Sequence, residues 1–368
     1  MARVAIVGAG AVARAYAVLL AREGHAPALW SPRGEGLRDL GDGGATAPAP
    51  GGYSVTARRV VVRGEGLVTG EYPVSVIAVP EALADADVVL VAVPANAYAG
   101  TLPRIAPHLR TGQVVFVSGA LSLAPLWLAE LAARHGGRPT LAASGTTVAT
   151  ARVRDGGVAV NTIRTRMAVA ALPVAATPAV IATLTGLFGD RFDAAGDVLA
   201  VTLSNINPVA HSAMALTNLT RMEYGEAWPQ YHYLTPAVAR LVGAMDAERR
   251  DVAAAFGHDL AAIEAHFQRS FDVPQETLAA IAAELHRRRG GPPGPTALDS
   301  RFVLEDVPFG LACNEALARI AQVPVPATSA TITVLATLYG RDFRRENPLL
   351  DALSLPAATP AALTARCR

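Results

Sequence analysis

A histidine in an apolar setting is the first residue of this chain that suggests chemistry. The segment NINPVAHSAMALTN, residues 205–218, places His211 among small and apolar residues, shortly after Asn207 and Pro208. Asparagine favours the N-cap of a helix and proline its first turn, so we expect a helix to begin at this point. At about 100° per residue, Asn207, His211 and Asn218 then lie close together on one helix face. This polar stripe indicates a polar ligand, although a lone histidine is more often a core residue bonded to a carbonyl.

A carboxylate suited to orient this imidazole stands far away in the sequence. The segment RFVLEDVPFG, residues 301–310, carries Glu305 and Asp306 within an apolar stretch just before a proline. A buried carboxylate needs a cationic or imidazole partner. A catalytic histidine usually needs a carboxylate that orients its ring and stabilises its charged form. We therefore expect Asp306 to pair with His211 and the pair to act in proton transfer.

A glycine turn near the start of the chain indicates nucleotide binding. Gly8, Gly10 and Ala13 form a G-x-G-x-x-A pattern between a buried-strand signal and a stretch with helical spacing. The first glycine permits the tight turn, the second lets the backbone approach a pyrophosphate, and the small alanine allows close helix–strand packing. Ala11 and Val12 then lie at a helix N-terminus, whose free N–H groups attract phosphate. We expect this loop to bind a dinucleotide; the alternative is a purely structural glycine turn.

The end of the second expected strand, residues 26–30, bears on which dinucleotide is bound. An acidic residue there would bind the ribose 2′-hydroxyl of NAD, but the chain continues as Ser31-Pro32-Arg33. Ser31 and Arg33 are suited to hold the 2′-phosphate of NADP, because a guanidinium binds phosphate through two hydrogen bonds. The sequence therefore favours NADP, with NAD possible; the alternative for Arg33 is an ordinary surface arginine.

The candidate cofactor-binding and catalytic residues fall in two parts of the chain with different secondary-structure patterns. The first half of the chain alternates strand and helix signals, and its apolar run VVLVAVP ends at Val93 and Pro94, which we assign to the cofactor site. Alternation within residues 52–80 predicts a β-hairpin insertion. The second half shows long helical periods instead. We therefore expect an α/β fold with a Rossmann-type dinucleotide-binding domain, 1–197, followed by an all-helical substrate-binding and catalytic domain, 198–368.

Composition narrows the class of protein. The 368 residues carry a net charge of +1, with 51% hydrophobic residues, which is typical of a folded chain without affinity for nucleic acid or anionic membranes. Cys313 and Cys367 are too few for a disulfide framework or a zinc site, so we expect no metal and a cytoplasmic location. We also expect no secretion signal and no membrane span. All 32 basic residues are arginine, which excludes lysine Schiff bases and lysine general acids.

The two distant motifs together resemble a known family. NxNPVxH followed by EDVPFGL, behind a Rossmann-type N-terminus, is similar to the octopine/nopaline (opine) dehydrogenase family, and the resemblance extends over nearly the whole chain. It implies an enzyme that condenses the amino group of an amino acid with a 2-oxo acid and reduces the resulting imine with NAD(P)H. The product is an N-(carboxyalkyl)amino acid. The partners would be these small molecules, with a homodimer possible.

The resemblance also implies roles for individual residues. The catalytic histidine of the family falls on His211 and its aspartate partner on Asp306. Asn207, one helical turn before the histidine, and Arg301, five residues before the aspartate, fall on substrate-binding positions. Arg301 would act as a clamp for a carboxylate.

A further family segment matches ASGTTVATAR, residues 143–152, at two positions. Thr146 and Arg152 agree with the family pattern and are assigned to substrate binding. Ala143 stands where the family often has a glutamate that would contact a basic amine. We therefore expect an amine substrate that is not arginine-like.

The expected site is a cleft between the two domains, where ligands usually bind in such folds. There His211 would donate a proton to the carbonyl or carbinolamine oxygen. One alternative is an NADPH-dependent reductase of simple 2-oxo acids, similar in architecture to the ketopantoate reductase and 6-phosphogluconate dehydrogenase families, which rely on a site lysine that this chain lacks. Another is a non-catalytic NADP-binding module, against which the His211–Asp306 pair and Arg301 argue.

Overall fold

The chain divides into two compact units. A computed structural model describes residues 1–40, 46–48 and 56–368. The first unit comprises Met1–Val201 with Arg366–Arg368, and the second comprises Thr202–Ala365. An α/β unit followed by a helical unit is the organisation that the sequence predicts, and it is confirmed.

The last three residues differ from the expected division, which placed the whole C-terminus with the helices. They pack within the first unit, because the main-chain N–H of Val174 donates to the carbonyl of Arg368 at 2.6 Å. The guanidinium of Arg366 also lies 2.7 Å from the carboxylate of Glu130. These contacts tie the chain end back to the sheet-containing unit.

One sheet organises the first unit. Its described strands are β1 Arg3–Val7, β2 Ala26–Trp30, β3 Thr46–Pro48, β4 Thr56–Gly66, β5 Gly70–Ile77, β6 Val88–Val91, β7 Val114–Ser118, β8 Thr140–Ser144, β9 Ala149–Arg154, β10 Gly157–Ile163, β11 Met167–Leu172 and β12 Phe192–Ala194. They run in the order β12-β11-β8-β7-β6-β1-β2-β5-β4-β10-β9, with β3 on β4. β1 is parallel to β2 and β6, and Ile6 pairs with Leu29 and Leu90. The carboxyl ends of these apolar strands therefore meet at one edge.

The predicted hairpin is confirmed within the described residues. β4 and β5 are antiparallel, with Arg63 opposite Glu71 and Val60 opposite Val74. Residues 52–55, which we expected to belong to this hairpin, lie outside the described residues.

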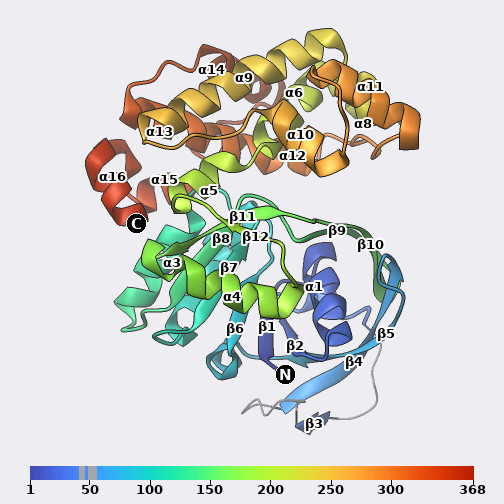
Figure 1. Cartoon of the computed structure of the whole chain (residues 1–368), viewed down its shortest axis with the longest axis vertical. Helices are drawn as coiled ribbons and strands as arrows, with labels where there is room; N and C mark the ends of the chain where they lie inside the picture. Colours follow the sequence, from blue (N-terminus) through green and yellow to red (C-terminus); the bar gives the residue numbers. More distant parts are fainter. Residues whose placement is uncertain (41–45, 49–55) are drawn as a thin grey trace. The chain divides into compact units, whose positions relative to one another are not determined.

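Helix α1 lies inside the curve of the sheet. The longer helices of this unit are α1 Ala11–Arg22, α2 Tyr98–Ile105, α3 Ala124–Arg134, α4 Thr177–Phe188 and α5 Val198–Ser204, and the last leads into the second unit. Short 3₁₀ turns are η1 Glu35–Leu37, η2 Pro80–Asp85, η3 Ala95–Ala97, η4 Ala106–His108 and η5 Val174–Ala176. Strands β4, β5, β9 and β10 curve around α1 (Figure 1). This wrapping buries Tyr16 and Leu20 completely and fixes the helix that follows the glycine turn.

The described part of the second unit contains helices and no strand of a sheet. The helices are α6 Asn207–Thr217, α7 Leu219–Glu223, α8 Gln230–Tyr233, α9 Pro236–Ala255, α10 Ile263–Phe271, α11 Leu278–Arg289, α12 Arg301–Leu304, the π-helix η6 Asp306–Leu311, α13 Ala312–Ala321, α14 Pro326–Tyr339, α15 Pro348–Ala352, η7 Leu355–Ala357 and α16 Pro360–Cys367. α6 packs against α9, α12, α14 and η6, so the histidine segment occupies the centre of this unit. The core here includes Met214, Val242, Val303, Leu311 and Ile332.

Candidate active site

The second unit brings together two side chains from distant segments of the chain. Nδ1 of His211 lies 2.8 Å from Oδ2 of Asp306, although the residues are 95 positions apart. The side chain of Asp306 is 2% exposed and that of His211 is 19% exposed. Because an ionised carboxylate only accepts hydrogen bonds, Nδ1 is the donor and Nε2 is left as the acceptor nitrogen of the neutral ring. The expected pairing of these two residues is confirmed; their catalytic role stays a prediction.

Phe302 fixes the plane of the imidazole. Its ring stacks on that of His211 with a centroid separation of 3.8 Å and an interplanar angle of 5°. The hydrogen bond to Asp306 sets the rotation of the ring within that plane. Among the described residues, Nε2 of His211 has no hydrogen-bond partner, so it is free to exchange a proton with a ligand.

A glycine allows the two segments to approach so closely. A Cβ atom added to Gly310 would lie 2.2 Å from Cγ of Pro208, at the first turn of α6. Only glycine therefore fits where η6 touches the start of the histidine helix. The side-chain amide of Asn347 donates to the carbonyl of Pro308 at 3.0 Å, which anchors the other side of η6. Pro208 and Gly310 thus let the backbones of α6 and η6 lie close together. This close packing places His211 within hydrogen-bond distance of Asp306.

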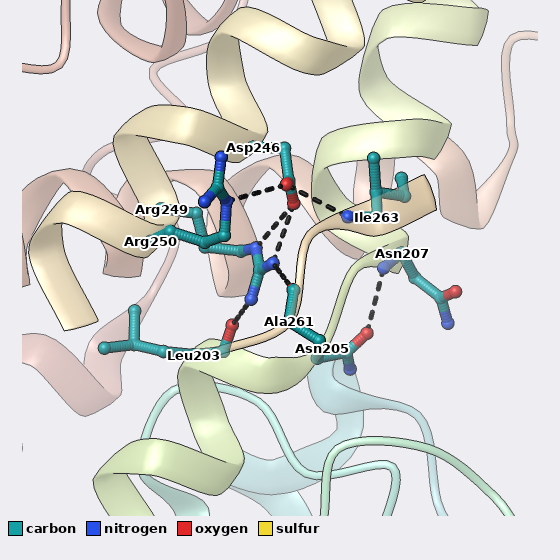
Figure 2. A network of polar contacts seen from close by, with 8 residues as sticks. All are labelled: Leu203, Asn205, Asn207, Asp246, Arg249, Arg250, Ala261 and Ile263. Carbon is teal, nitrogen blue, oxygen red and sulfur yellow. Dashed lines mark hydrogen bonds and ion pairs between the residues drawn. The ribbon is translucent and has the colours of Figure 1, made fainter. Parts of the chain in front are cut away.

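The start of α6 differs from the expectation in one detail. We expected Asn207 to cap this helix, but the side chain that binds there is Asn205, whose Oδ1 accepts from the main-chain N–H of Asn207 at 3.0 Å. The Asn207 side chain points away from this contact and is half-buried (Figure 2). Among the described residues it has no hydrogen-bond partner, so its amide is available to a ligand.

The expected polar stripe on α6 is shorter than the sequence suggested. Asn218 is buried, and its side-chain Nδ2 donates to the carbonyl of Met214 at 3.0 Å. It therefore satisfies the end of its own helix. The stripe that faces outward consists of Asn207 and His211.

A buried ion pair supports the segment that precedes α6. Figure 2 shows Arg249 of α9 between the carboxylate of Asp246 and two main-chain carbonyls. Its guanidinium lies 2.7 Å from Asp246, and it donates to the carbonyl of Leu203 at 2.7 Å and to that of Ala261 at 3.0 Å. Asp246 also accepts from the N–H of Ile263 at 3.1 Å. Burial lowers the pKa of Arg249, and Asp246 opposes that effect. The pair joins the end of α5 to α9 and the start of α10.

The other expected substrate-binding residues lie at the surface. Arg301 begins α12 with its side chain 59% exposed, 3.9 Å from the carboxylate of Glu305. Arg152 is exposed on β9, an edge strand of the first unit. Thr146 is half-buried in the turn after β8, where its carbonyl accepts from the hydroxyl of Ser144 at 2.7 Å. Arg301 and Arg152 are therefore accessible cations, and their binding roles stay predictions.

Ala143, the position on which the inference about the amine rests, is buried in the sheet. Ala143 lies inside β8, pairs with Val117 and Ala170 on the two neighbouring strands, and has no exposed surface. The methyl group of Ala143 therefore contacts its neighbours in the sheet. The expectation that the amine is not arginine-like stays a prediction.

The glycine loop of the first unit fits a dinucleotide. Gly8 has φ +142°, and a Cβ there would lie 2.5 Å from the carbonyl oxygen of Ala92 and 3.2 Å from Cβ of Ala13. Gly10 differs, because a Cβ there would meet nothing within 4 Å. That open space at the N-terminus of α1 is what close approach of a pyrophosphate requires. Ala11 and Val12 form the first turn of α1 at this point.

Residues near the glycine loop complete the candidate cofactor site. Val93 and Pro94 directly follow Ala92, which contacts Gly8, and both are accessible. Ser31 is half-buried and Arg33 exposed, just beyond the end of β2. Ser31 and Arg33 therefore lie on the loop after β2, and Val93 and Pro94 lie on the loop after β6. These two strands are the neighbours of β1 in the sheet.

Arg14 is a residue of this site that the sequence patterns did not reveal. Its guanidinium donates to the carbonyl of Ala9 at 3.0 Å and to that of Gly36 at 2.7 Å, and it pairs with Asp39 at 2.6 Å. Hydrogen bonds from Arg14 lower the pKa of Asp39 below its usual value. The arginine thus joins the glycine loop to the loop after β2. Its position inside the G-x-G-x-x-A-x pattern was the only signal in the sequence.

Neither a metal cluster nor a membrane-spanning helix occurs among the described residues. They contain no group of three or more His, Cys, Asp or Glu side chains placed to hold a metal ion. No helix in the described ranges is long and apolar enough to cross a membrane.

Comparison with known proteins gives two family matches. Residues 194–339 match the model described as NAD/NADP octopine/nopaline dehydrogenase, alpha-helical domain. Residues 4–119 match ketopantoate reductase PanE/ApbA. The second match ends within the first unit, so it concerns the nucleotide-binding fold and not the His211–Asp306 unit.

Individual relatives match the chain over nearly its whole length. An opine dehydrogenase of Arthrobacter sp. (strain 1C) is 28% identical over 364 residues, which are 98% of this chain and 97% of that protein. A solved structure of octopine dehydrogenase with NADH and L-arginine has a TM-score of 0.76 at 18% identity, covering 99% of this chain and 98% of that chain. Yersinopine dehydrogenase with NADP⁺ bound has a TM-score of 0.67 at 17% identity, covering 100% and 99%. The two structures show a shared fold.

The helical-domain match includes both His211 and Asp306, and the similarity to the curated relative extends over both units. Residues 194–339 are therefore similar to the helical domain of the octopine/nopaline dehydrogenase family, and the chain as a whole is similar to an opine dehydrogenase.

Proposed function

We propose that this protein is an NAD(P)H-dependent opine dehydrogenase. It condenses an amino acid or other amine with a 2-oxo acid, with loss of water, and reduces the resulting imine to an N-(carboxyalkyl)amino acid. The observation that carries the proposal is the hydrogen-bonded pair of His211 and buried Asp306 in the octopine-type helical unit. A unit with a glycine loop suited to a dinucleotide precedes it. The bound dinucleotide supplies the hydride.

His211 supplies the proton that imine formation requires. The addition of the amine to the 2-oxo acid gives a carbinolamine, whose hydroxyl leaves as water only after it gains a proton. Nε2 of His211 is the exchangeable nitrogen, since Asp306 holds the opposite nitrogen. The carboxylate stabilises the imidazolium that donates this proton. General acid–base catalysis of this kind contributes about 10²–10⁴-fold to the rate.

Other residues bind and orient the substrates. Asn207 lies one turn from His211 on the same helix, and its side-chain amide, which has no partner in the part of the chain that the structure describes, is available to a substrate oxygen. Arg301 and Arg152 are exposed cations suited to carboxylate groups, which both the 2-oxo acid and an amino acid carry. We also infer NADP as the preferred coenzyme, supported by Ser31 and Arg33 where an NAD-binding chain would place an acid.

Histidine replacement tests the mechanism. We expect His211→Gln to lower kcat by about 10²–10⁴-fold, while the affinity for NADPH stays unchanged. His135→Gln, an exposed position on the first unit, is the control and should keep full activity. A His211→Gln enzyme with near-normal turnover removes this residue from the mechanism.

A substrate screen tests the reaction itself. Oxidation of NADPH and NADH is followed with pyruvate, glyoxylate or 2-oxoglutarate, each with a panel of amino acids that includes arginine. Solved octopine dehydrogenases are described with arginine, agmatine and pyruvate, so these compounds belong in the panel. We expect oxidation that depends on both the amine and the oxo acid. Oxidation at the same rate without any amine would identify a simple 2-oxo acid reductase instead.

A further inference from the structure

An arginine from a different part of the chain binds the loop after β2. Arg104 of α2 donates from Nη1 to the main-chain carbonyl of Pro32 at 2.9 Å. Its Cζ lies 5.5 Å from the ring centroid of Trp30, the last residue of β2. Pro32 immediately precedes Arg33, so the guanidinium of Arg104 binds the short loop that also carries Arg33.

The end of β2 is the place where a Rossmann-type site recognises the adenosine ribose. Trp30 is 1% exposed and cannot supply a polar contact from its ring. Ser31 and Arg33 beyond it are accessible, and so is Arg104. The polar groups at this position are therefore a hydroxyl and two cations.

Neither arginine is neutralised within the described part of the chain. No carboxylate there forms an ion pair with Arg33 or Arg104, and the partners of Arg104 there are a neutral carbonyl and the ring of Trp30. A guanidinium has five N–H donors, so the single hydrogen bond to Pro32 leaves most of them available. Arg14, on the same unit, shows the contrast, because Asp39 compensates its charge. Two uncompensated cations favour a ligand with an anionic group.

We propose that Arg104 binds the 2′-phosphate of NADP together with Arg33 and so determines the preference for NADP over NAD. The proposal rests on the proposed dinucleotide function and names a further residue of that site. A phosphate monoester carries a charge of about −1.5 to −2 at neutral pH, which two guanidinium groups match in charge and in hydrogen-bond geometry. The bond to Pro32 holds Arg104 in place before the coenzyme binds.

Coenzyme binding without substrates tests this role separately from the reaction. Dissociation constants are measured by calorimetry for NADPH, NADH, 2′,5′-ADP and 5′-AMP with the wild type and with Arg104→Gln. We expect Arg104→Gln to weaken NADPH and 2′,5′-ADP by about 10–100-fold, since hydrogen bonds to charged groups are the strong ones. NADH and 5′-AMP should change by less than about 3-fold. Arg33→Gln should show the same pattern.

Arg110→Gln is the matched control. Arg110 is also exposed on the first unit and binds main-chain carbonyls, those of Ala84 and Ala86. Its replacement should leave all four dissociation constants unchanged. The proposal is overturned if Arg104→Gln weakens NADPH and NADH equally, which shows a structural role at Pro32, or if it changes neither. It is also overturned if the wild type binds 5′-AMP as tightly as 2′,5′-ADP. Failure of the amine and oxo acid screen would leave these binding results valid.

Discussion

Replacement of Gly310 by alanine tests how the His211–Asp306 pair is assembled. The added methyl group would lie 2.2 Å from Cγ and 2.3 Å from Cβ of Pro208. Ordinary contact between carbon atoms is about 3.5–4.0 Å, so η6 and α6 must separate by more than about 1 Å. Proline is a rigid neighbour, and it forms the first turn of the helix that carries His211. The displacement therefore passes into the segments that hold the pair.

The expected size of the effect follows from the distances. The hydrogen bond between His211 and Asp306 is 2.8 Å long, and an increase of about 1 Å takes it beyond hydrogen-bond range. A misplacement of about 1 Å at a catalytic group costs roughly 10²-fold in rate. Overpacking of a core typically lowers the free energy of unfolding by about 1–3 kcal/mol. We therefore expect a folded Gly310→Ala enzyme with kcat reduced by about 10²-fold.

The assay compares two glycine replacements in the same unit. Gly243 lies within α9, and a Cβ there meets nothing within 4 Å. Gly243→Ala should keep the wild-type kcat and gain up to about 1 kcal/mol in stability from helix propensity. Steady-state kinetics, urea unfolding and NADPH affinity are measured for both variants, and NADPH affinity should stay constant. A Gly310→Ala enzyme that is folded and has the kcat of the wild type would refute this account of the pair.

Three further predictions concern the supports of the two candidate sites. Asn205→Ala removes the acceptor for the Asn207 N–H, so the free energy of unfolding in urea should fall by about 1 kcal/mol and kcat should fall; unchanged stability would show that this hydrogen bond does not support the helix start. Arg249→Met removes the two hydrogen bonds from Arg249 to the buried carboxylate of Asp246, which keeps only Arg250 and the N–H of Ile263, so the free energy of unfolding in urea should fall by about 1–3 kcal/mol; a fall under about 1 kcal/mol would contradict the ion pair's role. Asp39→Asn should lower the melting temperature at neutral pH. Hydrogen bonds from Arg14 lower the pKa of Asp39 in the folded state, so the ionised carboxylate stabilises the fold. That stabilisation is fully present above pH 3.8, the ordinary pKa of an aspartate. It is lost as the pH falls through the lower pKa of the folded state, so the melting temperatures of variant and wild type should converge in acid. A difference that persists unchanged in acid would speak against this ion pair.

The parts of the fold that the sequence predicted best are those with local causes. Buried strands, the glycine turn and the period of α1 are visible in consecutive residues, and the structure has β1 at Arg3–Val7 and α1 at Ala11–Arg22. The hairpin of β4 and β5 also follows from alternation within one segment. The open space above Gly10 is what the glycine pattern implies.

The site was predictable only in part, because its contacts join distant segments. The pairing of His211 with Asp306 was expected from the need of a buried carboxylate for a partner and from the paired motifs of the family resemblance. The stacking of Phe302 on the imidazole gives no sequence signal, since an aromatic residue in an apolar run is normally a core residue. The same limit explains the error at Asn218, which binds its own helix.

A double-mutant cycle on kcat tests the central claim most directly. The claim is that His211 donates the proton and that Asp306 acts only through it. We expect His211→Gln to lower kcat by about 10²–10⁴-fold and Asp306→Asn to lower the kcat of the wild type as well. In the His211→Gln background, Asp306→Asn should then lower kcat by no more than about 2-fold. If Asp306→Asn lowers kcat by the same factor in both backgrounds, the two residues act independently and the claim is contradicted.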